Sequence, residues 1–448
     1  MTFDSRFAAG LAVALFLAMP AHAQTASFVS GPSVSDLACP NAPPPKPPTG
    51  PHIPEPMGGT DMPSADTLGP LAHTVIRDEP VIDPARIPQF ATGNGPRRIA
   101  VWGDSHIAAG PFMPTVQEVL RAKGITVATH FLPPTMGRAN VRLPALHAYC
   151  IGHGWSSELA FTSPTVVRTG PGLINRIADA GPESYLWLDL RNASLEATVR
   201  QLSIVYRAPQ GATLAYSVND GPEQTAELTA SSDSQALVIK GDALISNIRM
   251  RVVAGEFVLH GFMLDYDTPP AMTFDVFGLP SATARSWANV DTSYLTQALH
   301  GTDYDGVVLE YGTNEGNTLS FDSGKYEAGL VTALANMRAV FPHASCVLVG
   351  PPDRGVLLRH GGGSLDLLTF SRIHQQIEAV QALLGAQYNC VAWNWQDLMG
   401  GPGGSYGWAL NMPPLMGRDL THLSRDGYKR TGDALAHSLG WGTSPYPP

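Results

Sequence analysis

Two short polar stretches carry residue types that together could perform nucleophilic catalysis. The first, Gly103-Asp104-Ser105-His106, places a serine in a tight turn. The second, Asp419-Leu-Thr-His422, places a carboxylate three residues before an imidazole. A serine becomes a nucleophile when a base takes its proton, and a carboxylate can fix the tautomer of that base. The sequence thus supplies a candidate nucleophile, base and orienting acid in Ser105, His422 and Asp419.

Each stretch alone also has an ordinary structural interpretation. Asp and Ser are common at the N-terminal end of a helix, where they cap free N–H groups. A lone Asp-x-x-His is also typical of a solvated loop or a metal site. If this stretch forms a helical turn, residues three apart share a face, and Asp419 and His422 would then meet.

The elements around Ser105 favour the catalytic interpretation. Residues 99–102 are apolar and β-prone, the Gly-Asp-Ser turn follows at once, and residues 112–123 have a helical pattern. This order predicts a strand, a tight turn and a helix. Backbone N–H groups and the helix dipole at such a turn favour a developing negative charge.

Alternating strands and helices return after residue 270. Strand patterns begin at Phe274, Asp305, Cys346 and Cys390, and helices are expected over 326–341, 367–384 and 426–439. This alternation predicts a parallel sheet covered by helices on both faces. Ligands of such sheets bind at the carboxyl ends of strands. Because Ser105, Gly278 and Asn314 each directly follow a strand, we expect them to meet at one edge.

The segment 184–267 has a different texture. It consists of short runs that alternate apolar and polar residues, separated by turn signals such as Asn219-Asp220-Gly221. These runs predict an antiparallel β-sandwich inserted into the α/β domain. A carbohydrate-binding module and a structural insert without a ligand both fit this pattern.

The N-terminal residues are predicted to be a targeting signal and a linker. Residues 1–23 have an apolar stretch followed by Ala21-His-Ala23, as in a cleavable signal peptide, with an uncleaved anchor as the alternative. Residues 24–95 form a Pro-rich arm, and we expect no helix or sheet over 24–70. The α/β domain then comprises residues 96–183 and 268–448, and the protein is expected to be periplasmic or secreted.

Composition and cysteine content limit the function classes. The 448 residues are 44% hydrophobic, so the chain can bury a large core, and the net charge of −10 argues against nucleic acid as a partner. Four cysteines in an oxidising compartment favour disulfides over buried free thiols. We expect the pairs Cys346–Cys390 and Cys39–Cys150, the first because both cysteines begin strand-like runs.

The motifs in their order resemble those of the SGNH (GDSL-like) hydrolases. Gly103-Asp104-Ser105 is similar to the first motif of that family, Gly278 to the second, Gly312-Thr-Asn314 to the third and Asp419-x-x-His422 to the fifth. A closer likeness is to the branch that contains peptidoglycan O-acetylesterases, which also carry a β-sandwich between the first and second motifs. The chain departs from the pattern in the second motif, which reads Gly278-Leu-Pro-Ser-Ala where a second glycine is common.

The resemblance implies a three-layer SGNH hydrolase domain and a Ser-His-Asp triad that needs no metal or cofactor. Ser105 would attack an ester carbonyl, His422 would move the proton and Asp419 would orient His422. The N–H groups of Ser105 and Gly278 and the amide of Asn314 would form the oxyanion hole.

The expected function is removal of O-acetyl groups from a polysaccharide such as peptidoglycan. The expected partners are this substrate and the machinery of envelope or exopolysaccharide synthesis. Alternatives are an O-acyltransferase that uses the same triad on peptidoglycan or a polymer such as cellulose, a polysaccharide-binding protein with a vestigial site, and a lipase-like esterase.

Overall fold

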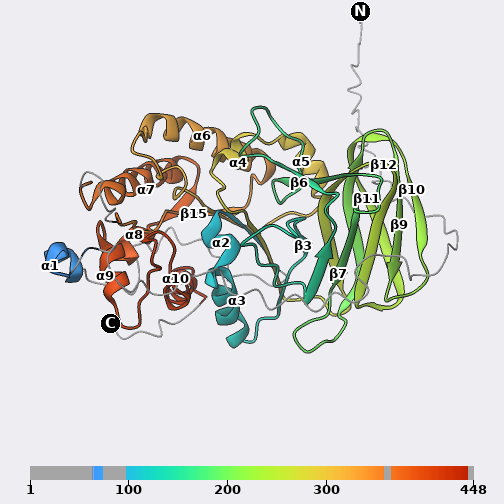
Figure 1. Ribbon diagram of the computed structural model, residues 1–448, viewed down its shortest axis with the longest axis horizontal. Coiled ribbons are helices and arrows are strands. Elements are labelled where there is room, and N and C mark those ends of the chain that lie inside the picture. The colour runs from blue at the N-terminus through green and yellow to red at the C-terminus, as the bar shows by residue number, and fades with distance from the viewer. Residues whose placement is uncertain (1–62, 64, 74–96, 358–364, 442–448) are drawn as a thin grey trace, which may run out of the picture.

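A parallel sheet flanked by helices and a large antiparallel sheet beside it make up the fold (Figure 1). The computed structural model describes residues 63, 65–73, 97–357 and 365–441. The predicted fold class, an α/β domain with an antiparallel β insert, is confirmed. The predicted signal peptide, residues 1–23, lies outside the described residues.

The parallel sheet has six strands in the order β16-β15-β14-β1-β13-β2. Every neighbouring pair in it runs parallel. The strands are β1 (Arg97–Gly103), β2 (Val127–Ala128), β13 (Met272–Gly278), β14 (Gly306–Glu310), β15 (Ser345–Val349) and β16 (Cys390–Trp393). The four long segments expected to form strands after residue 270 therefore lie in one sheet with the strand that precedes Ser105.

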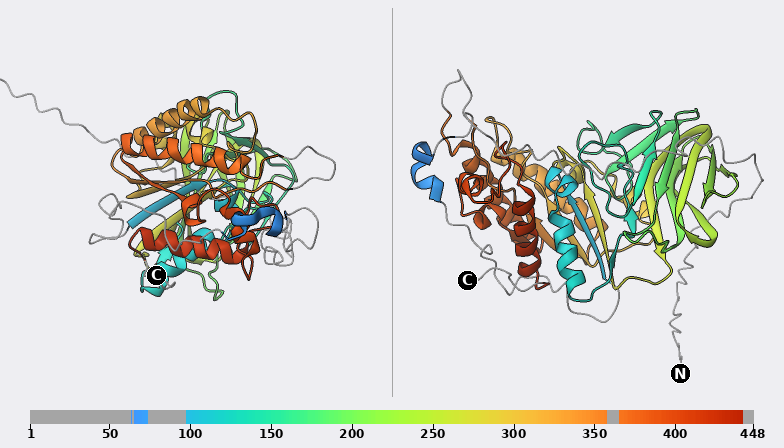
Figure 2. Two further views of the ribbon diagram at one scale, coloured as in Figure 1. Left: turned by 90° about the vertical axis from the view of Figure 1, so that its left-hand side faces the viewer. Right: turned by 60° about the horizontal axis from the view of Figure 1, so that its bottom comes forward.

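Helices cover both faces of this sheet, as the uninterrupted apolar runs of its strands predict. Along β1, Ala100 and Trp102 belong to one buried cluster, whereas Ile99 and Val101 belong to another. Helices α6 (Ser323–Val340) and α7 (Thr369–Gln387) lie over the first cluster. Helices α3 (Phe112–Ala122) and α10 (Arg425–Ser438) lie over the second, on the opposite side (Figures 1 and 2).

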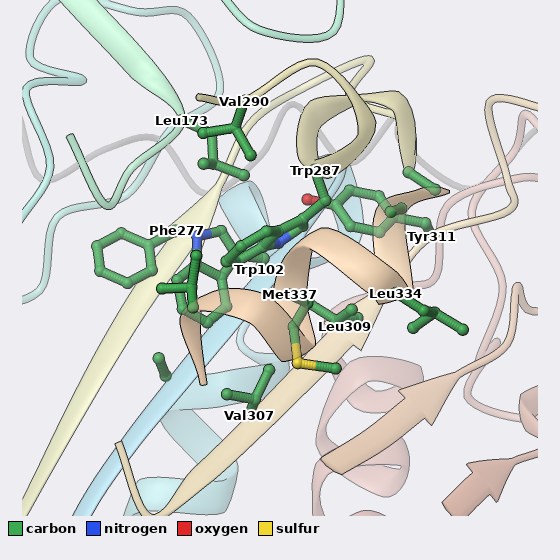
Figure 3. Close-up of a cluster of buried hydrophobic side chains, with 14 of the residues drawn as sticks. Trp102, Leu173, Phe277, Trp287, Val290, Val307, Leu309, Tyr311, Leu334 and Met337 are labelled. Carbon is green, nitrogen blue, oxygen red and sulfur yellow. The ribbon is translucent and has the colours of Figure 1, made fainter. Parts of the chain in front are cut away.

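Trp102 is central to the first cluster (Figure 3). Its ring stacks on Phe277 at 4.9 Å and meets the edge of Trp287 at 5.0 Å. The indole N–H donates to the carbonyl of Pro171 over 2.7 Å, so the buried ring leaves no polar atom unpaired. Because Trp102 is three residues before Ser105, this packing fixes the end of β1 from which the turn departs.

The antiparallel sheet has ten strands and is built around β12 (Asn247–Tyr266). The first half of β12 pairs with β7 and β9, and the second half pairs with β6 and β8. Between the halves, Gly255 has a φ of +73°, and a Cβ there would lie 2.2 Å from the carbonyl oxygen of Gly211. The sheet therefore curls, and one core holds side chains from both halves.

The antiparallel sheet extends beyond residues 184–267 on the N-terminal side. Its strands are β3 (Phe131–Leu132), β4 (Ala148–Ile151), β5 (Ser156–Leu159), β6 (Ile174–Asp179), β7 (Tyr185–Asp189), β8 (Val199–Ala208), β9 (Ala212–Val218), β10 (Gln224–Leu228), β11 (Ser231–Ile245) and β12. The first four precede residue 184. They are short and separated by Gly- and Pro-rich loops, so period-two alternation does not reveal them.

Part of the Pro-rich arm is helical, so the expectation of no helix over 24–70 is wrong at its C-terminal end. Residues Ala65–Leu68 form α1 and Gly69–His73 form the 3₁₀ helix η2, next to α9 (Gly404–Leu410). Leu68 is buried in the second apolar cluster, which stabilises this segment. The other short helices are α2 (Ser105–Ala109), α4 (Arg285–Ala288), α5 (Thr292–Ala298) and α8 (Trp395–Leu398).

The predicted disulfide Cys346–Cys390 is present and joins β15 to β16. The two cysteines are direct partners in the parallel register, with their Cα atoms 4.5 Å apart. The second predicted pair includes Cys39, which lies outside the described residues. None of the helices in the described ranges has the length and hydropathy of a membrane span.

Candidate active site

Ser105 is the first residue of α2 and follows directly on the turn that ends β1. Asp104 caps this helix, because its Oδ1 accepts the His106 N–H over 2.8 Å. Gly103 permits the turn, since a Cβ there would lie 2.3 Å from Ile107 and 2.7 Å from Glu310. The serine is half-buried at the carboxyl edge of the sheet, as the strand, turn and helix pattern predicts.

Ser105, His422 and Asp419 form one continuous hydrogen-bonded relay. Ser105 Oγ lies 3.0 Å from His422 Nε2, and His422 Nδ1 lies 2.6 Å from Asp419 Oδ2. The other oxygen, Oδ1, accepts the N–H groups of Thr421 and His422 at 3.0 and 2.9 Å. Both carboxylate oxygens are therefore held, and the imidazole is oriented toward the serine.

The Asp419–His422 segment is a bend before α10, not a turn of helix. Leu420 has a φ of +50°, and the Gly417 N–H donates to the His422 carbonyl over 2.6 Å. The helix itself begins only at Arg425. The spacing predicted the contact between the two side chains, but a closed loop produces it.

The charges in the relay shift both pKa values in the directions that favour an ion pair. Burial lowers the pKa of His422, but the hydrogen bond and charge of Asp419 outweigh burial, so the pKa rises above 6.5. Burial raises the pKa of Asp419, but its hydrogen bonds with His422 outweigh that effect, so its pKa falls below 3.8. The imidazolium that forms after proton abstraction would therefore be stabilised.

Asn314 lies in the loop after β14 and points its amide at the turn that carries Ser105. Its Nδ2 donates to Asp104 Oδ2 over 3.2 Å and to the Ala282 carbonyl over 2.9 Å. Glu315 braces the same loop by accepting the N–H groups of Gly312 and Ala284 at 3.1 and 2.8 Å. The loops after β13, β14 and β1 are thus joined beside the serine.

The buried carboxyl groups of Asp104 and Glu310 and the half-buried carboxyl group of Glu315 support this junction. Burial raises the pKa of Asp104 to about 6 and that of Glu315 to about 7, and it raises the pKa of Glu310 well above its ordinary value. Glu310 Oε2 accepts the Asp104 N–H over 3.1 Å. All three carboxyl groups accept backbone N–H groups at the strand ends, so in the free protein they position the loops around Ser105.

Gly278 lies within the sheet, and Ser281 lies three residues further on, in a turn beside the cavity. Gly278 pairs with Gly103 in the sheet and packs against α2, where a Cβ would lie 2.4 Å from the Ala108 nitrogen. It is not among the residues that line the cavity, whereas Ser281 is. Ser281 is exposed in a turn with a φ of +66°, a conformation that favours glycine.

A cavity of about 450 Å³ adjoins the relay, within the size range of small-molecule sites. All three relay residues line it, together with Asn314, Ser281 and Tyr428. The Tyr428 hydroxyl and His106 Nδ1 share a hydrogen bond of 2.8 Å, and the buried His106 ring packs against Trp395. His106 therefore supports the cavity wall through packing and this hydrogen bond.

Sequence reasoning missed Ser281 and Arg354 as cavity residues. The only signal near Ser281 was the second motif itself, which reads Gly278-Leu-Pro-Ser-Ala where a second glycine is common. Arg354 follows β15 without any motif. Only its position at the same strand edge as Ser105 could have indicated it.

The fold is that of the SGNH (GDSL-like) hydrolases. No family model and no curated protein sequence matches the chain. Among solved structures, a peptidoglycan O-acetylesterase superposes with a TM-score of 0.59, covering 85% of this chain and 97% of that one at 20% identity. At this identity the likeness establishes the fold and leaves the substrate open.

Two further solved structures match with low scores. A family two carbohydrate esterase from Clostridium thermocellum in complex with cellohexaose has a TM-score of 0.27 and 12% identity, over 66% of this chain and 100% of that one. Est24, a carbohydrate acetylesterase from Sinorhizobium meliloti, has a TM-score of 0.27 and 17% identity, over 38% and 78%. These scores are too low to support a functional argument.

Proposed function

We propose that the protein is a serine esterase that removes O-acetyl groups from a cell-envelope or extracellular polysaccharide. The observation that carries this proposal is the relay from Ser105 through His422 to Asp419 at the wall of the cavity. The esterase-like fold supports the same reaction class. The likeness to a peptidoglycan O-acetylesterase prompts the choice of an acetylated sugar as substrate.

The proposed reaction has two steps that share one base. Ser105 Oγ attacks the acetyl carbonyl carbon while His422 Nε2 takes the hydroxyl proton. When the tetrahedral intermediate collapses, the C–O bond to the sugar breaks and His422 returns the proton to the leaving alcohol. Water then attacks the acetyl-serine with His422 as the base again, and acetate leaves.

The proposed oxyanion hole consists of the N–H groups of Ser105 and Ser281 and the amide of Asn314. Ser281 takes the place expected for Gly278, because it lines the cavity and Gly278 is covered by α2. Both Nδ2 hydrogens of Asn314 are engaged in the free protein. Since the 3.2 Å contact with Asp104 is the longer, we expect that N–H to turn to the oxyanion.

Water is favoured over a sugar hydroxyl as the acyl acceptor. The side chains of His422 and Asp419 are 41% and 37% exposed, so solvent reaches the base directly. An acyltransferase must exclude water from the acyl-enzyme.

The intact relay also argues against a binding protein with a vestigial site. The sequence of residues 1–23 and the Cys346–Cys390 disulfide support a periplasmic or secreted location.

The decisive experiment measures acetate release from O-acetylated peptidoglycan and an acetylated β-glucan. The mature protein is compared with Ser105→Ala, with an unacetylated sugar acceptor added to half of the reactions. We expect free acetate from the wild type and a loss of at least about 10⁴-fold in the variant. Acetyl groups on the acceptor would instead establish a transferase, and binding without either product would establish a vestigial site.

A further inference from the structure

Arg354 lines the catalytic cavity on the side of Asp419. It follows β15 after the short segment 350–353, at the same strand edge as Ser105. Asn317, in the loop after β14, lines the cavity next to it. Arg354 is close enough to the relay for its charge to lower the pKa of His422.

The Arg354 side chain is held in place by its neighbours. Its guanidinium lies 4.3 Å from the centroid of the Phe370 ring, and its Nη1 donates to Asn317 Oδ1. Its backbone carbonyl accepts the Ser371 hydroxyl over 3.2 Å. The cation is therefore oriented before any ligand arrives, which reduces the entropy lost on binding.

Arg354 has no acidic partner in the described part of the chain. Other arginines in the described ranges do form ion pairs, among them Arg97, Arg168, Arg191, Arg249, Arg251 and Arg372. Burial lowers the pKa of Arg354, and the charge of nearby Asp419 offsets this only in part. Both oxygens of Asp419 are engaged by the His422 segment. Arg354 Nε is buried, and no described residue forms a hydrogen bond with it.

Among the described residues no carboxylate pairs with this partly buried cation, and burial of an unpaired charge is costly. We propose that Arg354 and Asn317 form a subsite for a carboxylate on the polysaccharide substrate. The guanidinium offers donors in a planar fork that matches a carboxylate. Asn317 accepts from Arg354 through its oxygen, which leaves its amide nitrogen to donate to the same group.

This inference rests on the proposed esterase function and narrows its substrate to acidic sugars. The carboxylate belongs to the acetylated residue or its neighbour, because Arg354 and Ser105 line one cavity. Two kinds of glycan have this chemistry: polyuronates, and peptidoglycan with its lactyl and peptide carboxyl groups. Neutral acetylated glucans lack it.

The test compares kcat/KM for acetate release from acetylated polygalacturonate, O-acetylated peptidoglycan and an acetylated β-glucan. The proteins are the wild type, Arg354→Gln and Arg354→Lys, with Arg200→Gln as the control. Arg200 is an exposed arginine of β8 and does not line the cavity. We expect the wild type to have a higher kcat/KM on one acidic polymer than on the β-glucan. Arg354→Gln should reduce the ratio of these two kcat/KM values about ten- to hundredfold, mainly through KM. Arg354→Lys should retain part of this preference for the acidic polymer, because it keeps the positive charge. Added salt should lower the preference of the wild type, because it screens the charges.

Equal losses on acidic and neutral substrates would overturn the inference, because Arg354 would then act through His422 or the fold. Absence of any acidic preference in the wild type would also overturn it. A separate binding measurement does not depend on turnover. It compares Ser105→Ala with the double variant Ser105→Ala/Arg354→Gln, and each is titrated with oligogalacturonate and with a de-O-acetylated muropeptide. Binding weakened by Arg354→Gln supports the subsite even if no acetate is released and the esterase proposal fails. Binding unaffected by the substitution overturns the subsite alone.

Discussion

The side-chain amide of Asn314 donates to Asp104, the residue immediately before the proposed nucleophile, over 3.2 Å. The same carboxylate accepts the His106 N–H at 2.8 Å, and the Asp104 N–H in turn donates to Glu310 at 3.1 Å. One buried side chain therefore couples the helix that carries Ser105 to the loop that carries the proposed oxyanion donor. This coupling makes the geometry of the site testable residue by residue.

Asn314→Ala tests the proposed oxyanion hole. Loss of one preorganised donor reduces kcat by about 10²–10³, with a smaller change in KM, because the donor acts mainly on the transition state. Steady-state kinetics on a small acetyl ester measures this, and circular dichroism checks that the variant is folded. A change confined to KM would show that Asn314 only binds the ground state.

The pH dependence of the wild type reports the protonation of His422. The base must be neutral to accept the Ser105 proton, and its pKa lies above 6.5. We therefore expect kcat/KM to fall as the pH drops through a midpoint above 6.5, and Asp419→Asn to reduce activity sharply. A midpoint below 6.5 would contradict the raised pKa.

Asp104→Asn tests the positioning role of Asp104. Its charge raises the pKa of His422, so its removal shifts the midpoint of the acid limb to lower pH. The variant also lowers kcat, because Asn314 loses the acceptor that orients its amide. A lower kcat with an unshifted midpoint would indicate a purely structural role. The profile of kcat/KM from pH 4 to 9 distinguishes the two outcomes.

Gly278→Ala and Ser281→Gly are a matched pair that separates close packing from backbone conformation. A Cβ at Gly278 would lie 2.4 Å from the Ala108 nitrogen, so α2 must move and we expect destabilisation by about 1–3 kcal/mol. Glycine suits the φ of +66° at position 281, so that change stabilises by about 1 kcal/mol. Guanidinium unfolding measures both. Equal stabilities for the two variants would refute the assignment of close packing to Gly278.

Removal of the Cys346–Cys390 disulfide tests its contribution to stability. The bond spans 44 residues, and loop-closure entropy predicts a loss of about 2–4 kcal/mol in the double serine variant. The unfolding midpoint should fall for the variant and for the reduced wild type by similar amounts. A variant as stable as the oxidised wild type would show that packing of β15 against β16 suffices without the bond.

The strands of the parallel sheet and the residues of the relay could be predicted from the sequence alone. Uninterrupted apolar runs such as 99–102 reveal buried parallel strands, and a strand that ends in a polar turn identifies Ser105 and Asn314 as residues of one edge. The Cys346–Cys390 bond was predictable for the same reason, since both cysteines begin strands. These features depend on a few consecutive residues, so local patterns carry them.

The atoms that face the cavity depend on how distant segments pack. The register of β1 with β13 places Gly278 under α2 and leaves the exposed turn to Ser281. The same packing of distant segments brings Arg354 to the relay and draws strands from before residue 184 into the curled sheet. Close approach between segments far apart in the chain depends on how those segments pack, so the order of residues does not specify it.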